Sequence, residues 1–250
     1  MAIKVKNGAI KINLSGISRF PYLYLVFSIV FAIFVLGPPF LGFQFGPYPL
    51  MHVADVLDIF TALVILPLYW LMFRSRGDTT SLRQNLVFVV FAAFWALGKG
   101  MHLAANSIDN LITLKGLQSG DIYNLVYFYD ETLGHYLWHF GVIGLSALLI
   151  YRESHDSLSM ATAKTKSNIA AGIIYGFVFF AMVVEGTTVD MGLPFSVLAL
   201  ILIAVWNRTK LSQRPLTILF LIGYSLALVL FIIWGVWHQG FPGFFEAGIL

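Results

Sequence analysis

The chain has 250 residues, of which 59% are hydrophobic and 11% are charged, and its formal net charge is +3. Soluble domains carry roughly 25% charged residues, so this composition excludes an ordinary soluble domain and indicates a polytopic membrane protein. The 15 basic residues are spread over several short segments, which argues against nucleic-acid binding, and the absence of cysteine excludes disulfides, thiolate zinc sites and cysteine nucleophiles.

Seven apolar stretches follow one another along the chain. A helix needs about 20 apolar residues to cross the hydrocarbon of a bilayer. The predicted spans are 22–43, 52–73, 84–107, 124–151, 168–187, 193–206 and 216–238, the fourth being long and the sixth short. They predict an all-α fold, a seven-transmembrane helix bundle over 22–238, with a segment over 1–21 before it and a short tail over 239–250 after it.

Basic residues fall in alternate connecting segments. They lie in 1–21, 74–83, 152–167 and 207–215, and the two exceptions among the 15 are Lys99 and Lys115. The positive-inside rule therefore places 1–21 in the cytoplasm, beside anionic membrane lipids, and 239–250 outside. We predict a multi-pass integral protein of a plasma or inner membrane.

With this orientation, most histidines and acidic residues lie near the outer face of the membrane. Ionisable groups are costly near a bilayer core, so a whole layer of them is a candidate functional site. The layer comprises His52, Asp55, Asp58, His102, Asp130, Glu131, His135, His139, Glu185, Asp190 and His238.

The span over 124–151 carries the densest part of this polar layer. Glu131, His135 and His139 are spaced i, i+4 and i+8, which places them on one face of an α-helix. Such a stripe suits one or two metal ions, and His at i, i+4 is a known metal-binding spacing. The alternative is that these side chains bind neighbouring helices or interfacial water.

The span over 84–107 places His102 at a matching depth. At 1.5 Å per residue, His102 lies about 8 Å below the outer end of this span, and His135 and His139 lie about 6 and 12 Å below theirs. Asn106 shares the face of His102. Lys99 either pairs with Asp58, Asp130 or Glu185, or extends outward to the interface.

Other members of the layer are open to two interpretations. Glu185 follows a long apolar run, which suits a metal ligand or a proton carrier, but it also suits a helix end that faces water. Asp58 lies too far into its helix to be explained by the helix dipole alone. His238 either covers a site from above or anchors the helix end beside two tryptophans.

The arrangement resembles the seven-transmembrane metal-dependent hydrolases of the alkaline ceramidase and adiponectin-receptor type. The likeness rests on the helix number, the ligand types, a histidine late in the third span (His102) and one in the seventh (His238). The H-x-x-x-H pair of this chain is on the fourth span rather than the last. The resemblance implies zinc and hydrolysis, and it implies no role for any particular residue.

These observations favour a membrane metalloprotein with an outward-facing site. The expected metal ligands are His102, Glu131, His135, His139, Glu185 and His238, with Glu131 or Glu185 transferring protons as catalytic residues. Zinc is the expected ion and would activate water against a lipid bond, whereas iron or copper would suit oxidation of an apolar substrate. The alternatives are a proton or ion pathway through Asp58, Lys99, Asp130, Glu131 and Glu185, and a non-catalytic subunit of a larger membrane complex.

Overall fold

The computed structural model describes residues 3–6, 9–12, 22–47, 51–75, 80–155, 165–206 and 214–249. Two short strands, β1 (Ile3–Lys6) and β2 (Ala9–Ile12), pair antiparallel with Ile3 opposite Ile12. The rest of the described chain is helical, in these elements: α1 (Leu23–Leu36), η2 (Pro38–Phe40), α2 (Val53–Arg74), α3 (Leu82–Leu114), α4 (Asp121–Tyr127), η3 (Phe128–Gly134), α5 (His135–His155), α6 (Thr165–Glu185), α7 (Val189–Trp206) and α8 (Pro215–His238). The predicted helical membrane bundle is therefore present, with a small hairpin outside it.

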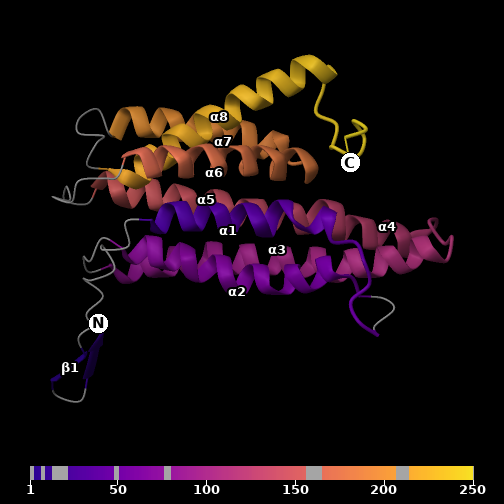
Figure 1. Ribbon diagram of the computed structural model, residues 1–250, viewed down its shortest axis with the longest axis horizontal. Helices are drawn as coiled ribbons and strands as arrows, with labels where there is room; N and C mark the ends of the chain where they lie inside the picture. Colours follow the sequence, from indigo (N-terminus) through magenta and orange to yellow (C-terminus); the bar gives the residue numbers. More distant parts are fainter. Residues whose placement is uncertain are drawn as a thin grey trace.

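Six of these helical stretches are long and apolar enough to cross a membrane, and α1 is a shorter apolar helix of 14 residues. α1 ends at Leu36, earlier than the predicted limit of 43, because Gly37 is followed by Pro38 and Pro39, which lack the N–H that a helix needs. α3 runs for 33 residues, or about 50 Å, and so exceeds a hydrocarbon layer of about 30 Å. Figure 1 shows its end projecting beyond the other helices together with α4.

The helices run roughly parallel to a common long axis, and the closest neighbours are α6 with α8, α3 with α5, and α1 with α6 (Figure 1). Glycines allow this close approach. A Cβ on Gly98 of α3 would lie 2.2 Å from the backbone nitrogen of Trp138 on α5, and one on Gly176 of α6 would lie 2.3 Å from the carbonyl oxygen of Gly223 on α8. Small residues at helix contacts are typical of membrane bundles.

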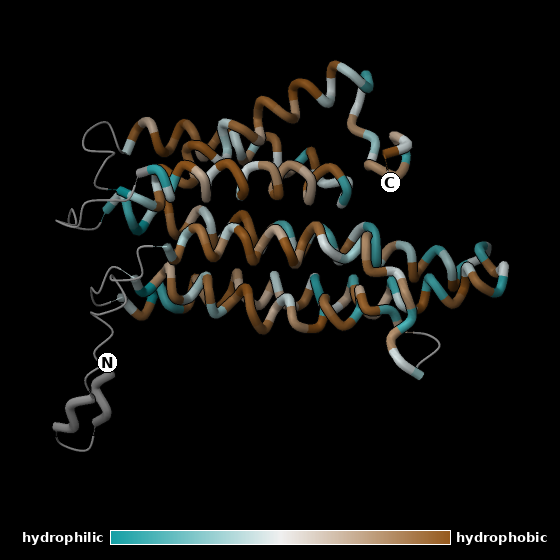
Figure 2. Tube along the Cα trace, in the orientation of Figure 1, coloured by the Kyte–Doolittle hydropathy of each residue, from teal (hydrophilic) through white to brown (hydrophobic). Residues whose placement is uncertain are grey.

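The outward faces of the helices are apolar. Large hydrophobic side chains such as Leu63, Leu86 and Val236 are 64%, 56% and 76% exposed. Figure 2 shows hydrophobic residues along most of each helix and hydrophilic ones concentrated towards the ends. Since an exposed apolar surface of this extent suits lipid rather than water, the chain is a multi-pass integral membrane protein.

The core between the helices is rich in aromatic side chains. Phe27 and Phe31 of α1 stack on Tyr175 of α6, whose hydroxyl lies 3.0 Å from that of Tyr224 on α8 and 2.9 Å from Oγ of Ser146. These rings fix α1, α6 and α8 relative to one another. The cavity described next opens between α1 and α6 on one side and α2 and α3 on the other.

Candidate ligand cavity

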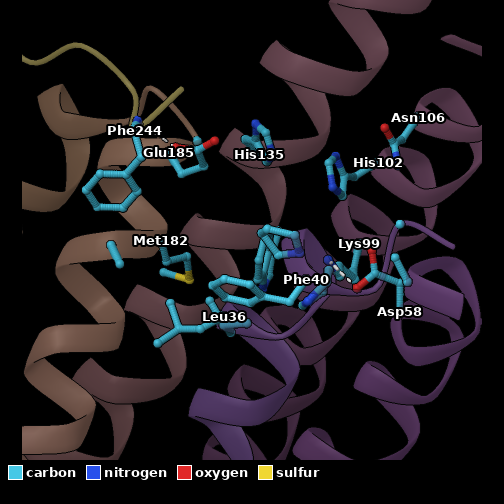
Figure 3. Close-up of a pocket in the computed structure, with 18 of the residues that line it drawn as sticks. Leu36, Phe40, Asp58, Lys99, His102, Asn106, His135, Met182, Glu185 and Phe244 are labelled. Carbon is cyan, nitrogen blue, oxygen red and sulfur yellow. Dashed lines mark hydrogen bonds and ion pairs between the residues drawn. The ribbon is translucent and has the colours of Figure 1, made fainter. Parts of the chain in front are cut away.

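A cavity of about 810 Å³ lies near the end of the bundle that carries the polar layer. Its wall comes from the end of α1, η2, α2, α3, η3, α5, α6 and the C-terminal segment. One part of the wall is apolar, including Leu36, Phe40 and Met182, and another part carries His102, His135 and Glu185 (Figure 3). The cavity therefore has two chemically different sides.

A buried ion pair forms part of the polar side. Nζ of Lys99 lies 2.9 Å from Oδ1 of Asp58, and both side chains are about 5% exposed. The same ammonium lies 4.3 Å from the ring centre of Trp138, which is close enough for a cation–π interaction. Asp58 is one of the three partners allowed for Lys99 by the sequence, and Figure 3 shows the pair beside the cavity.

A π-helical turn positions the next acidic groups. η3 over Phe128–Gly134 joins α4 to α5 within one continuous helical stretch. Because a π-turn holds an extra residue, it rotates the residues before it relative to the α-helix that follows. Asp130 is thereby directed at α3, where its Oδ1 lies 2.6 Å from Nδ1 of His102, while the side chain of Glu131 stays 38% exposed.

Three of the five histidines of the layer, His102, His135 and His139, lie in a row. The ring centres of His102 and His135 are 4.6 Å apart, and those of His135 and His139 are 5.7 Å apart. Each Nδ1 faces a protein oxygen: the Asp130 carboxylate for His102, the Glu131 carbonyl at 3.1 Å for His135, and Thr188 Oγ1 at 2.6 Å for His139. The rings are therefore oriented by the protein and lie beside one another rather than around a common point.

Glu185 closes the cavity on the α6 side. Its Oε2 accepts a hydrogen bond of 2.8 Å from the backbone nitrogen of Phe244, which holds the C-terminal segment against the end of α6. Phe244 and Ile249 of this segment also line the cavity. The segment is further tied down by Trp234, whose Nε1 donates to the carbonyl oxygen of Pro242 at 3.1 Å.

Most of the predicted site residues meet at this cavity. Asp58, Lys99, His102, Asn106, Glu131, His135 and Glu185 line it, and Asp130 stands behind His102. His139 is fully buried behind His135 and is not on the wall. His238 lies apart from the cavity, with its ring 4.2 Å from that of Trp234 on α8.

The predicted metal ligands are only partly brought together in the described part of the chain. Among the residues that the structure describes, no group of three or more histidine or acidic side chains is placed to hold a metal ion. His238 lies elsewhere, beside Trp234. The contacts of the other three histidines involve Nδ1 only and orient their rings, so they do not decide whether Nε2 binds an ion. The i, i+4, i+8 argument assumed an unbroken α-helix, whereas Glu131 lies within the π-turn. Metal binding and the catalytic roles of Glu131 and Glu185 stay predictions.

Sequence reasoning missed three residues of importance here. Trp138 lines the cavity and contacts Lys99. Its position three residues after His135, on the same helix face, was a signal that could have identified it. Thr188 hydrogen-bonds His139 from the turn between α6 and α7, and no sequence motif predicts this contact. Glu153, on α5 at the opposite end of the bundle, accepts hydrogen bonds from the backbone nitrogens of Leu216 and Thr217 and so caps α8.

Comparison with known proteins gives one distant relative. The chain is 24% identical over 202 residues to the ceroid-lipofuscinosis neuronal protein 6 homolog of the dog, Canis lupus familiaris, which covers 72% of this chain and 62% of that protein. The matched part thus spans less than two thirds of the relative's length. No protein-family model matches the chain, and no solved structure matches it.

This relative corrects the resemblance drawn from the sequence. The match is to this protein and not to alkaline ceramidases or adiponectin receptors, so the assignment to those hydrolases was wrong. Helix number and residue types are shared by many membrane bundles and are weak evidence of kinship. The paired histidines of that superfamily's last helix are missing, and α8 carries only His238.

Proposed function

We propose that this protein binds an amphipathic, lipid-like ligand in the cavity near one end of its helix bundle. The observation that carries the proposal is the division of a single cavity wall into an apolar side and a polar side. Ligand cavities of several hundred Å³ with mainly apolar walls and a few converging polar groups are typical of small-molecule sites. The name of the relative states no ligand or activity, so the proposal rests on the cavity alone.

Each side of the cavity suits one part of an amphipathic ligand. The apolar chain would lie against Leu36, Phe40 and Met182, and the head group against His102, His135 and Glu185 (Figure 3). Polar groups that line a cavity inside a membrane bundle must be satisfied by protein, water or ligand, because lipid tails offer no hydrogen bonds. A ligand head group would supply such partners to this wall.

Filling the cavity tests the proposal. Protein purified in a mild neutral detergent should retain about one equivalent of an amphiphile that solvent extraction and mass spectrometry detect. Met182→Trp places a larger side chain at the apolar wall and should lower the retained amount about tenfold, a loss of 1.4 kcal/mol in binding. Ile173→Trp is the matched control on α6, because Ile173 is 49% exposed and does not line the cavity.

Two results would contradict the proposal. One is wild-type protein that carries no stoichiometric amphiphile and takes up none on reconstitution with lipid. The other is a folded Met182→Trp variant, with a wild-type melting temperature in detergent, that retains as much as Ile173→Trp.

Elemental analysis of the same preparations tests the metal prediction separately. One or two equivalents of zinc, iron or copper, lost in a folded His135→Ala/His139→Ala variant, would favour the metal-dependent hydrolase or oxidase. The ion pathway and the non-catalytic subunit also stay predictions, and ion flux into liposomes would identify the former. The cellular membrane in which the protein resides stays a prediction as well.

A further inference from the structure

The charged side chains of the cavity wall do not balance. Four carboxylates line it, from Asp55, Asp58, Glu131 and Glu185, against the single ammonium of Lys99. That ammonium is already paired with Asp58 at 2.9 Å and rests on the ring of Trp138. Among the described residues, the wall therefore has no lysine or arginine left for the other three carboxylates, and only histidines lie beside Asp55 and Glu131.

Two of these carboxylates, from Glu131 and Glu185, lie near the same histidine, His135. Oε2 of Glu131 is 3.7 Å from Nδ1 of His135, and the residue after Glu185, Gly186, is so close to the same ring that a Cβ on it would lie 3.2 Å from His135 Cγ. Figure 3 shows Glu185 next to His135. Among the described residues neither glutamate has a lysine or arginine partner: Glu131 contacts a histidine, and Glu185 accepts a backbone N–H.

Asp55 differs from these two glutamates. Its Oδ2 accepts a hydrogen bond of 2.7 Å from the backbone nitrogen of His52 and lies 3.9 Å from that residue's Nδ1. It caps the start of α2, where the helix dipole favours a negative charge. The local structure thus accounts for Asp55, and the uncompensated charge is that of Glu131 and Glu185.

A second observation also points to a ligand. Trp138 lines the cavity and is 5% exposed, yet its Nε1–H has no acceptor within the described part of the chain. A buried donor without an acceptor is costly, so an oxygen of a bound molecule near this wall would be favoured. Phe40 and Phe244 add aromatic rings to the same cavity, and such rings attract cations.

We infer that the cavity selects amphiphiles with a cationic amine head group, held between Glu131 and Glu185, with an oxygen close enough to accept from Trp138. Two carboxylates that face one cavity repel each other, and an ammonium ion between them would relieve that repulsion while providing three donors. This inference rests on the proposed function, because it names the class of ligand that the same cavity takes.

The test compares three molecules with one alkyl chain: hexadecylamine, hexadecanol and hexadecanoate. Their binding to the full-length protein in neutral detergent is followed by titration calorimetry at neutral pH, where the amine is protonated. We expect the amine to bind about tenfold more tightly than the alcohol, as one charge-assisted hydrogen bond would give, and the carboxylate to bind most weakly.

Variants locate the source of the preference. In Glu131→Gln/Glu185→Gln the amine should lose its advantage and bind no more tightly than the alcohol. Asp121→Asn is the control, because Asp121 is an exposed acid in the first turn of α4 and does not line the cavity. It should keep the wild-type preference for the amine.

The outcomes separate this inference from the proposed function. If none of the three molecules binds, the amphiphile site itself is refuted. If all bind but the amine is not preferred, or if the preference survives in the double variant, the site stands and the cationic head group is wrong. Preference for hexadecanoate would overturn the inference and assign the head group to Lys99.

Discussion

At the residue scale, the most unusual feature is a lysine that is 4% exposed inside a membrane bundle. Charges in such a setting persist when they are paired, and Lys99 has both a carboxylate and an aromatic face. Asp58 and Lys99 join α2 to α3 and form one edge of the cavity. Their pairing is therefore structural as well as part of the site.

Replacing only one member of the Asp58–Lys99 pair should destabilise the fold more than replacing both. Asp58→Asn or Lys99→Met alone leaves an uncompensated buried charge and should destabilise the fold by about 3 kcal/mol, whereas the double variant should lose less than either single variant. Chemical unfolding in detergent, read as a double-mutant cycle, measures this. Strictly additive losses would show that the two groups are independent.

The sequence identified the chemistry of most site residues but not their geometry. Polar residues in apolar helices are rare enough to be recognised, so Asp58, Lys99, His102, Glu131 and Glu185 could be found without a structure. Residue spacing could not reveal the π-turn that rotates Asp130 towards His102. Depth along a helix also says nothing of direction around the bundle, which is why His238 was grouped with residues that it does not approach.

At the scale of elements, helix packing positions the site. α3 and α5 carry Lys99, His102, His135 and Trp138, and they approach closely because Gly98 and Gly141 present only backbone at the contact. A Cβ on Gly141 would lie 2.6 Å from the backbone nitrogen of Trp95. The distance between these helices therefore sets the distance between the two histidines.

Two glycines on α3 offer a matched test of this packing. Gly98→Ala should destabilise the protein by about 1–3 kcal/mol, since the new methyl group collides with the α5 backbone. Gly100→Ala, where a Cβ meets nothing within 4 Å, should be neutral or stabilising because alanine favours the helix. Melting temperatures in detergent compare the two, and equal effects would contradict the close α3–α5 contact.

The start of α8 depends on an acid from another helix. Glu153 on α5 is 2% exposed and accepts hydrogen bonds from the backbone nitrogens of Leu216 and Thr217, groups that have no partner within their own helix. Arg214, just before α8, donates to the backbone oxygen of Glu153. This cluster fixes α8 against α5 at the end of the bundle away from the cavity.

Removing this cap should loosen α8 without altering the cavity. Glu153→Gln loses the charge that favours a helix N-terminus and should cost about 1–2 kcal/mol, while the exposed Asp121→Asn should stay within about 0.5 kcal/mol of wild type. Denaturant unfolding measures the change in the free energy of unfolding, and titration of the amphiphile checks that binding is retained. A Glu153→Gln variant as stable as Asp121→Asn would show that the cap contributes nothing.

At the scale of the whole molecule, charge and polarity are distributed unequally between the two ends of the bundle. The N-terminal hairpin and the C-terminal segment lie at opposite ends (Figure 1). The helix ends that carry Arg74, Arg152 and Arg214 belong to the end of the hairpin, and the cavity lies towards the other. If the basic end is cytoplasmic, as the positive-inside rule predicts, ligands would enter from the outer leaflet or the outer aqueous phase.

The absence of cysteine makes this orientation directly testable with two matched leucines at the ends of α3. Leu82 is 75% exposed at its first turn, and Leu117, just past its end, is 60% exposed. In sealed right-side-out vesicles, Leu117→Cys should react with a membrane-impermeant maleimide, and Leu82→Cys should react only after permeabilisation. The reverse pattern would invert the predicted topology and place the cavity at the cytoplasmic face. Reaction of both variants in sealed vesicles would instead show that α3 does not cross the membrane.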